Sequence, residues 1–189
     1  ERRPLIFGVI QGGGYPDLRK ACAEALLEMG FDGFGFGGWP LDDQSKLLTD
    51  ILEYTRSVVP RQFPIHALGI GHPVSVSACY RMGYEMFDCA MPTRDARHGR
   101  LYALTTASAV PGTGTDWFGF RYVNDEKYMR SQEPVSPGCD CPACQHYSLA
   151  YLNHLYHMQD SAYFRLATQH NLRFMTRLME QLRDEPLLR

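Results

Sequence analysis

The chain has 189 residues, a length that permits one domain with a sizeable hydrophobic core. Apolar residues make up 44% of it and charged residues 21%, which is typical of a folded globular protein and argues against disorder. The formal net charge is −2, so contact with a nucleic acid would depend on a local basic patch. No apolar run approaches the roughly 20 residues of a membrane-spanning helix, and we expect no membrane partner.

Strand-like and helix-like segments alternate over the first half of the chain. Strands are predicted over 5–13, 31–40, 63–73 and 84–92, and helices over 15–30, 42–60 and 74–83. On the first helix, the predicted buried face consists of Leu18, Cys22, Ala25, Leu26 and Met29. This alternation is typical of βαβ units with a parallel sheet. Four such units form half of a (β/α)8 barrel, and a flavodoxin-like layered fold is the alternative on periodicity alone.

The second half of the chain loses this alternation. Residues 105–138 are rich in loop-forming residues, with a possible β-hairpin around 116–123. Helices are predicted over 145–158, 161–169 and 171–183, the last of them with apolar residues along one face.

Three of the six cysteines lie close together in the segment CDCPACQ. Cys139, Cys141 and Cys144 have the spacing C-x-C-x₂-C, at which thiolates can converge on one tetrahedral ion. We predict His170 as the fourth ligand; the other candidates are His146, His154 and His157. Four protein ligands make a closed, structural Zn²⁺ site, one per chain, and three core or redox cysteines are the alternative. A tight cluster beside scattered thiols also indicates a reducing compartment, which predicts a cytoplasmic protein.

Glycines and polar side chains follow each predicted strand at its carboxyl end. Gln11 lies in VIQGGG, glycines recur in GFGGWP and LGIGHP, and Asp88 ends the fourth strand. Because the carboxyl ends of parallel strands meet at one edge of a sheet, these positions are predicted to line a ligand pocket. The amide of Gln11 offers a donor and an acceptor to a planar heterocycle, although a polar turn residue is the alternative. The chain has no GxGxxG or Walker lysine motif, which argues against a nucleotide-phosphate cradle.

Asp88 lies at the end of a predicted buried strand, just before a basic segment that contains Arg94 and Arg97. Three roles suit this carboxylate. It is a nucleophile, a general base, or an acid paired with Arg94 or Arg97. A carboxylate nucleophile suits displacement at an anomeric carbon, where it traps an oxocarbenium-like centre. The basic segment is predicted as a loop that either binds phosphate or is simply solvated.

Taken together, several segments resemble the tRNA-guanine transglycosylases, also called queuine tRNA-ribosyltransferases. The segments are FGVIQGG, GFDGFGFGG, LGIGHP, MFDCAMPTRDARHG, CDCPAC and HNLRFMTRLMEQLR. The resemblance implies a (β/α)8 barrel with an inserted zinc-binding subdomain, of which this chain is the C-terminal half. It implies a transferase of queuosine biosynthesis that exchanges guanine at the tRNA wobble position for a 7-deazaguanine base (preQ1 or queuine). The implied partners are the tRNA anticodon stem-loop and that base.

The resemblance also implies roles for individual residues. Asp88 matches the nucleophile that forms a covalent bond to the ribose. Gln11, Gly38, Trp39 and Leu68 match positions around the base, and Arg94 and Arg97 match a segment that holds the RNA. Cys139, Cys141, Cys144 and His170 match the zinc ligands.

Two departures from the family pattern stand out. Trp39 replaces a leucine that is usual in the family, and the segment 101–138 looks longer than usual. The alternatives to a tRNA-modifying enzyme are a paralogue that modifies DNA and a non-catalytic, RNA-binding partner subunit.

The expected organisation is a half barrel over 1–100, a loop-rich insertion with the zinc subdomain over 101–170, and a closing helix over 171–189. The sequence starts without Met, directly before a strand, so we expect a piece of a larger protein. Two further aspartates of the family would then lie outside this chain, which would be inactive alone. Exposed strand edges predict a homodimer or association with the missing N-terminal half.

Overall fold

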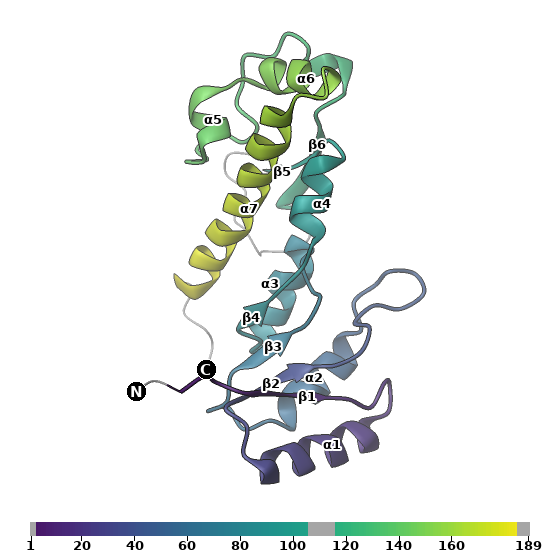
Figure 1. Cartoon of the computed structure of the whole chain (residues 1–189). Coiled ribbons are helices and arrows are strands. Elements are labelled where there is room, and N and C mark those ends of the chain that lie inside the picture. Colours follow the sequence, from purple (N-terminus) through teal and green to yellow (C-terminus); the bar gives the residue numbers. More distant parts are fainter. Residues whose placement is uncertain (1–2, 106–115, 185–189) are drawn as a thin grey trace. The chain divides into compact units, whose positions relative to one another are not determined.

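The structure, a computed structural model, describes residues 3–105 and 116–184 (Figure 1). The chain divides into two compact units between Cys89 and Ala90. The boundaries expected at residues 100 and 170 stay predictions, although residue 170 lies inside one continuous helix. Within the described ranges, no helix combines the length and the apolarity needed to cross a bilayer.

The first unit is a parallel four-stranded sheet with three helices, in strand order β1-β2-β3-β4. Its elements are β1 (Phe7–Ile10), α1 (Pro16–Met29), β2 (Gly33–Phe36), α2 (Thr49–Ser57), β3 (Ile65–Ala67), α3 (Pro73–Met82) and β4 (Met86–Phe87). Sequential parallel strands joined by right-handed crossovers place all three helices on one face of the sheet. The predicted βαβ arrangement is therefore confirmed, as a parallel α/β sheet.

The two faces of this sheet differ in their side chains. Ile10, Phe34 and Phe36 are fully buried on the face that carries the helices. On the opposite face Val9 is 39% exposed and Met86 is 41% exposed. We call this second face the open face. Residues are assigned to it by the alternation of side chains along each strand and by the observed register between strands.

The helices of the first unit differ in detail from the sequence-based prediction. On α1, Leu18 and Met29 are exposed, and the buried positions are Arg19 and Ala23. The predicted buried face of this helix was therefore wrong by about one residue, because the long side chain of Arg19 is part of the face that is buried. Helix α2 begins at Thr49, not at 42, since residues 41–47 form a turn in which Asp42 Oδ1 accepts hydrogen bonds from backbone N–H groups.

In its described residues, the second unit combines a two-stranded antiparallel sheet with four α-helices. Its elements are α4 (Met91–Arg97), β5 (Arg100–Leu104), β6 (Phe118–Tyr122), a 3₁₀ turn (Glu126–Tyr128), α5 (Pro142–His146), α6 (Leu149–His157) and α7 (Ser161–Asp184). Strands β5 and β6 pair as the predicted hairpin, and its connecting residues 106–115 lie outside the described ones. The helix predicted over 145–158 is two helices, because Ser148 caps the start of α6 by accepting a hydrogen bond from Tyr151 N.

Helix α7 is one continuous helix where two were predicted, and its middle ties the unit together (Figure 1). Asn171 is fully buried, and its Oδ1 accepts a hydrogen bond from Tyr102 N at 3.0 Å. Its Nδ2 donates to Pro92 O and Arg100 O, both at 3.0 Å. One amide therefore satisfies backbone groups of α4 and β5, which explains why a polar residue sits inside this core.

Candidate functional site

The strand ends of the first unit bring four of the predicted site positions to one edge of the sheet. Gln11 follows β1, Gly38 follows β2, Leu68 follows β3 and Asp88 follows β4. The parallel register, with Ile10 beside Phe36 and Ala67 beside Phe87, forces these ends to lie at the same level. The four positions therefore share one edge of the sheet, and their role in lining a ligand pocket stays a prediction.

The Asp88 side chain is 59% exposed, and one of its two oxygens is held by the protein. Oδ1 accepts a hydrogen bond from Gly69 N at 3.0 Å and lies 2.9 Å from His66 Nε2. The His66 contact has the distance of an ion pair but lacks the alignment of a hydrogen bond. Asp88 is thus an exposed carboxylate held by two groups of the β3 segment, and His66 is a candidate site residue that the sequence pattern did not indicate.

Gln11 lies against a glycine of the neighbouring strand end. A Cβ atom at Gly37 would stand 2.5 Å from Gln11 Nε2, so a side chain at that position would displace the amide. The backbone N–H of Gln11 donates to Cys22 Sγ at 3.4 Å, which anchors the residue to α1. Gly37 therefore leaves the space in which the Gln11 amide lies.

Arg19 braces the loops that carry Gln11 and Gly38, although the sequence analysis gave it no role. Its guanidinium donates to Gly13 O at 2.7 Å, Ile10 O at 3.4 Å and Gly37 O at 3.0 Å. It also lies 4.2 Å from the centre of the Phe36 ring. Burial lowers the pKa of Arg19, since these partners are carbonyls and a ring, none of which carries a full negative charge. The apolar stripe predicted for this helix did not include Arg19, so the sequence pattern gave no signal for its burial.

Two apolar positions expected around a base differ in exposure. Trp39 is 76% exposed beside Gly38, which has a φ of 101° that favours glycine. Leu68 is half-buried, and its Cδ1 would lie 3.1 Å from a Cβ at Gly35. Leu68 therefore covers a glycine of β2, whereas Trp39 is available to a ligand.

The basic segment after Asp88 is helix α4 and not the predicted loop. Arg94 and Arg97 are both exposed on this helix. Asp95 is buried between them and accepts a hydrogen bond from Tyr102 Oη at 2.9 Å. The buried acid fixes α4 on β5, so the segment becomes a helix with its arginines toward solvent.

Cys139, Cys141, Cys144 and His170 converge in the second unit, as predicted. Their ligand atoms all lie within 4.8 Å of one another. His170 Nδ1 is 3.9, 3.3 and 3.4 Å from the Sγ atoms of Cys139, Cys141 and Cys144 respectively. A tetrahedral zinc ion with ordinary bond lengths sets sulfur and nitrogen about 3.6 Å apart. The four residues therefore fit a closed zinc site of the structural kind.

The surroundings of His170 fix which ring nitrogen faces the sulfurs. Nε2 donates to Tyr102 O at 2.7 Å, which leaves the lone pair of Nδ1 for a metal. Hydrogen bonds from Cys141 and Cys144 hold the pKa of the Cys139 thiol well below its ordinary value. Contact with Cys139 raises the pKa of Cys144 in turn. Without a metal, Cys144 therefore keeps its proton beside the Cys139 thiolate, so zinc binding to three thiolates would release protons and weaken at low pH.

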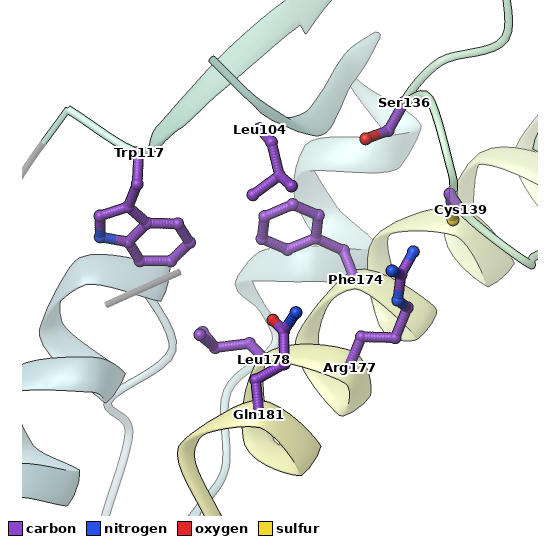
Figure 2. A pocket seen from close by; sticks show the side chains of 8 residues that line it. All are labelled: Leu104, Trp117, Ser136, Cys139, Phe174, Arg177, Leu178 and Gln181. Carbon is purple, nitrogen blue, oxygen red and sulfur yellow. The ribbon is translucent and has the colours of Figure 1, made fainter. Parts of the chain in front are cut away.

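A small cavity lies beside the zinc ligands, between α7 and the hairpin (Figure 2). Its volume is ≈ 20 Å³, room for about one water molecule and too little for a nucleobase. Its walls are mainly apolar, with Trp117 and Phe174 as stacked rings. We therefore treat it as a packing gap of the second unit.

Comparisons with known proteins place the chain in one family. A family model described as Queuine tRNA-ribosyltransferase matches residues 1–185. The Queuine tRNA-ribosyltransferase of Psychrobacter cryohalolentis is 39% identical over 179 residues, which is 95% of this chain and 45% of that protein. That of Mannheimia succiniciproducens is 40% identical over 178 residues, 94% of this chain and 44% of that protein. A Putative queuine tRNA-ribosyltransferase of Archaeoglobus fulgidus is 39% identical over 184 residues, 97% of this chain and 44% of that protein. The chain thus spans somewhat less than half the length of these curated relatives.

Replacing one metal ligand should remove the ion and loosen the second unit. We expect Cys141→Ser to lower bound zinc from about one ion per chain to near zero, because three remaining ligands hold the ion far more weakly. Metal analysis after gel filtration measures this, and circular dichroism follows the loss of α5–α7 packing. Cys22→Ser, which changes a thiol outside the cluster, is the matched control. Full zinc content in Cys141→Ser would contradict the assignment.

Proposed function

Because this chain belongs to the queuine tRNA-ribosyltransferase family, we propose that it carries the base-exchange site of a tRNA-guanine transglycosylase. Such a pentosyltransferase replaces guanine at the tRNA wobble position with a 7-deazaguanine base, preQ1 or queuine. The observation that carries the proposal is Asp88, an exposed carboxylate with one oxygen held by Gly69 N and the other left for attack. It lies at the same sheet edge as Gln11 and Gly38.

The proposed mechanism is a double displacement through Asp88. Asp88 Oδ2 attacks C1′ of the ribose while the C1′–N9 bond breaks, and guanine leaves with the electron pair and takes up a proton. The incoming base then attacks C1′ through its N9, loses the N9 proton, and returns the electron pair of the ester bond to Asp88. A covalent intermediate divides one difficult exchange between two weakly nucleophilic bases into two easier steps.

Base recognition is assigned to the ends of β1, β2 and β3. The Gln11 amide offers one donor and one acceptor to the purine edge, and the backbone groups of Gly38 and Trp39 lie at the neighbouring turn. Leu68 supplies an apolar wall. The exposed Trp39 ring, where the family usually has a leucine, offers a larger stacking surface to the base.

RNA binding is assigned to the exposed cations of α4. Arg94 and Arg97 stand on one short helix that the buried Asp95 fixes to β5. Such arginines suit phosphate contacts, which position an RNA without reading its sequence. The structural zinc supports this role indirectly, because His170 holds Tyr102 O on the same strand that anchors α4.

We propose that base exchange needs a second region, which supplies the family's two further aspartates. The proposed location of the protein is the cytoplasm. The sheet of the first unit ends in β1 and β4, whose outer edges are unpaired among the described residues. Such edges accept further strands, as closure of a (β/α)8 barrel would require. We call this chain joined to the second region the complete protein.

The nucleophile assignment predicts the outcome of one conservative substitution. In the complete protein, Asp88→Asn should lower guanine exchange by about a thousandfold or more, because the amide cannot form the ester. Exchange of labelled guanine and a denaturing gel for the covalent RNA adduct measure both effects. Asp17→Asn, an exposed acid on α1, is the matched control. An adduct in Asp88→Asn would overturn the proposal, and exchange on duplex DNA but not on tRNA would favour the DNA-modifying paralogue.

The contact between Gly37 and Gln11 predicts a coupled effect on base affinity. Gly37→Ala and Gln11→Ala should each weaken guanine binding to the complete protein by about tenfold, since both remove the same amide from its place. The double variant should be little worse than either single variant, because the two changes share one cause. Calorimetric titration with guanine measures this. Additive losses would show that Gly37 acts through something other than Gln11.

The open edges predict association of the isolated chain. We expect this chain alone to form dimers or larger species as its concentration rises, either through β1 and β4 or by binding the second region when that is supplied. Light scattering at several concentrations measures the mass. A well-folded monomer across the whole range would contradict this prediction.

A further inference from the structure

We infer that His66 is a positioning residue for Asp88, an inference that rests on the proposed function. It holds Oδ1 together with the backbone of Gly69, selects Oδ2 as the attacking oxygen, and stabilises the carboxylate when Asp88 leaves the ribose. Its partner atom is the same Oδ1 that Gly69 N contacts, at 2.9 Å from His66 and 3.0 Å from Gly69. Two polar groups of one segment thus converge on a single oxygen.

The sheet explains why His66 reaches Asp88. In the parallel register His66 lies beside Gly35 on one side and beside Met86 on the other. Asp88 is two residues beyond Met86, so the period of a strand returns it to the open face on which His66 lies. The strand pairing therefore places His66 beside the residues of β4 that lead directly into Asp88.

The chemistry of the contact requires a hydrogen on Nε2. A bare Nε2 lone pair would face a carboxylate oxygen and repel it, so the ring is the Nε2–H tautomer or the imidazolium. The Nε2 atom is itself buried and has no hydrogen-bond partner, although the side chain as a whole is 23% exposed. Its interaction with Asp88 is accordingly electrostatic, with the imidazole side of the contact buried and the carboxylate side open to solvent.

The two chemical steps use this contact differently. In the first step Oδ2 forms a bond to C1′ and the C1′–N9 bond breaks, so a fixed Oδ1 determines which oxygen attacks. In the second step the C1′–Oδ2 bond breaks and its electron pair returns to the carboxylate. A polar N–H or positive charge at Oδ1 stabilises that leaving group where the charge develops. Loss of the contact should therefore slow release of the covalent intermediate more than it weakens substrate binding.

The test compares variants of His66 in the complete protein. A glutamine places its amide nitrogen near the position of Nε2, whereas an asparagine is one carbon shorter and cannot reach Oδ1. His66→Gln should keep near-normal exchange. His66→Asn and His66→Leu should lower kcat by about tenfold with little change in KM for the RNA or the base. The fraction of RNA trapped as covalent adduct during turnover should rise in these two variants.

Three results would overturn the inference. The first is a normal kcat and normal adduct fraction in both His66→Asn and His66→Leu. The second is an equal loss in His66→Gln and His66→Asn, which would indicate packing and not a polar contact. The third is a rise in KM alone. Asp88→Asn, run in parallel, separates the two proposals: an adduct in that variant overturns the proposed function, whereas its absence together with any of the three results overturns only the role of His66. Circular dichroism of each variant confirms folding.

Discussion

The parallel pairing of β1 to β4 is the constraint on which the candidate site depends. Each strand is four residues or fewer, yet the register places their carboxyl ends side by side. Residues separated by nearly eighty positions, such as Gln11 and Asp88, thereby reach one edge without any direct contact between their own segments. Arg19 adds a second constraint, because a buried guanidinium gathers carbonyls from the ends of both β1 and β2. The site is thus held by backbone pairing of the strands and by one buried side chain that binds their terminal carbonyls.

The second unit depends on two neighbouring residues of α7 that act on the same strand. His170 holds the carbonyl of Tyr102 while its other nitrogen faces the cysteines, and Asn171 holds the N–H of Tyr102. Both polar groups of one β5 residue are therefore bound by consecutive side chains of one helix. The zinc site and the packing of α4 are in this way parts of one hydrogen-bonded arrangement, which explains why the helix runs through residue 170 without a break.

Sequence patterns predicted mainly those features that depend on neighbouring residues or on a repeated period. The metal-binding spacing of the cysteines and the alternation of strands and helices were confirmed, because the first depends on residues near one another and the second on a repeated period. The choice of His170, 26 residues beyond Cys144, was also confirmed, and the family resemblance supported it. His66 and Arg19 were missed, since their importance appears only when strand pairing and loop carbonyls are known. Helix α4 was predicted as a loop because the burial of Asp95 depends on Tyr102, a residue of β5. The stripe on α1 failed because an apolar count gives no weight to an arginine that packs on Phe36.

The glycines of β2 carry a consequence of their own. Gly33 and Gly35 have ordinary backbone angles, so their side-chain positions are bare for reasons of space: a Cβ at Gly33 would collide with the Phe7 ring, and one at Gly35 would press on Leu68. Every amino-acid change that a single nucleotide substitution can make at a glycine codon introduces at least a Cβ. On the open face, any such change at Gly33 therefore requires the Phe7 ring to move or to become smaller, whereas a change at Gly35 requires Leu68 to shift by a few tenths of an ångström.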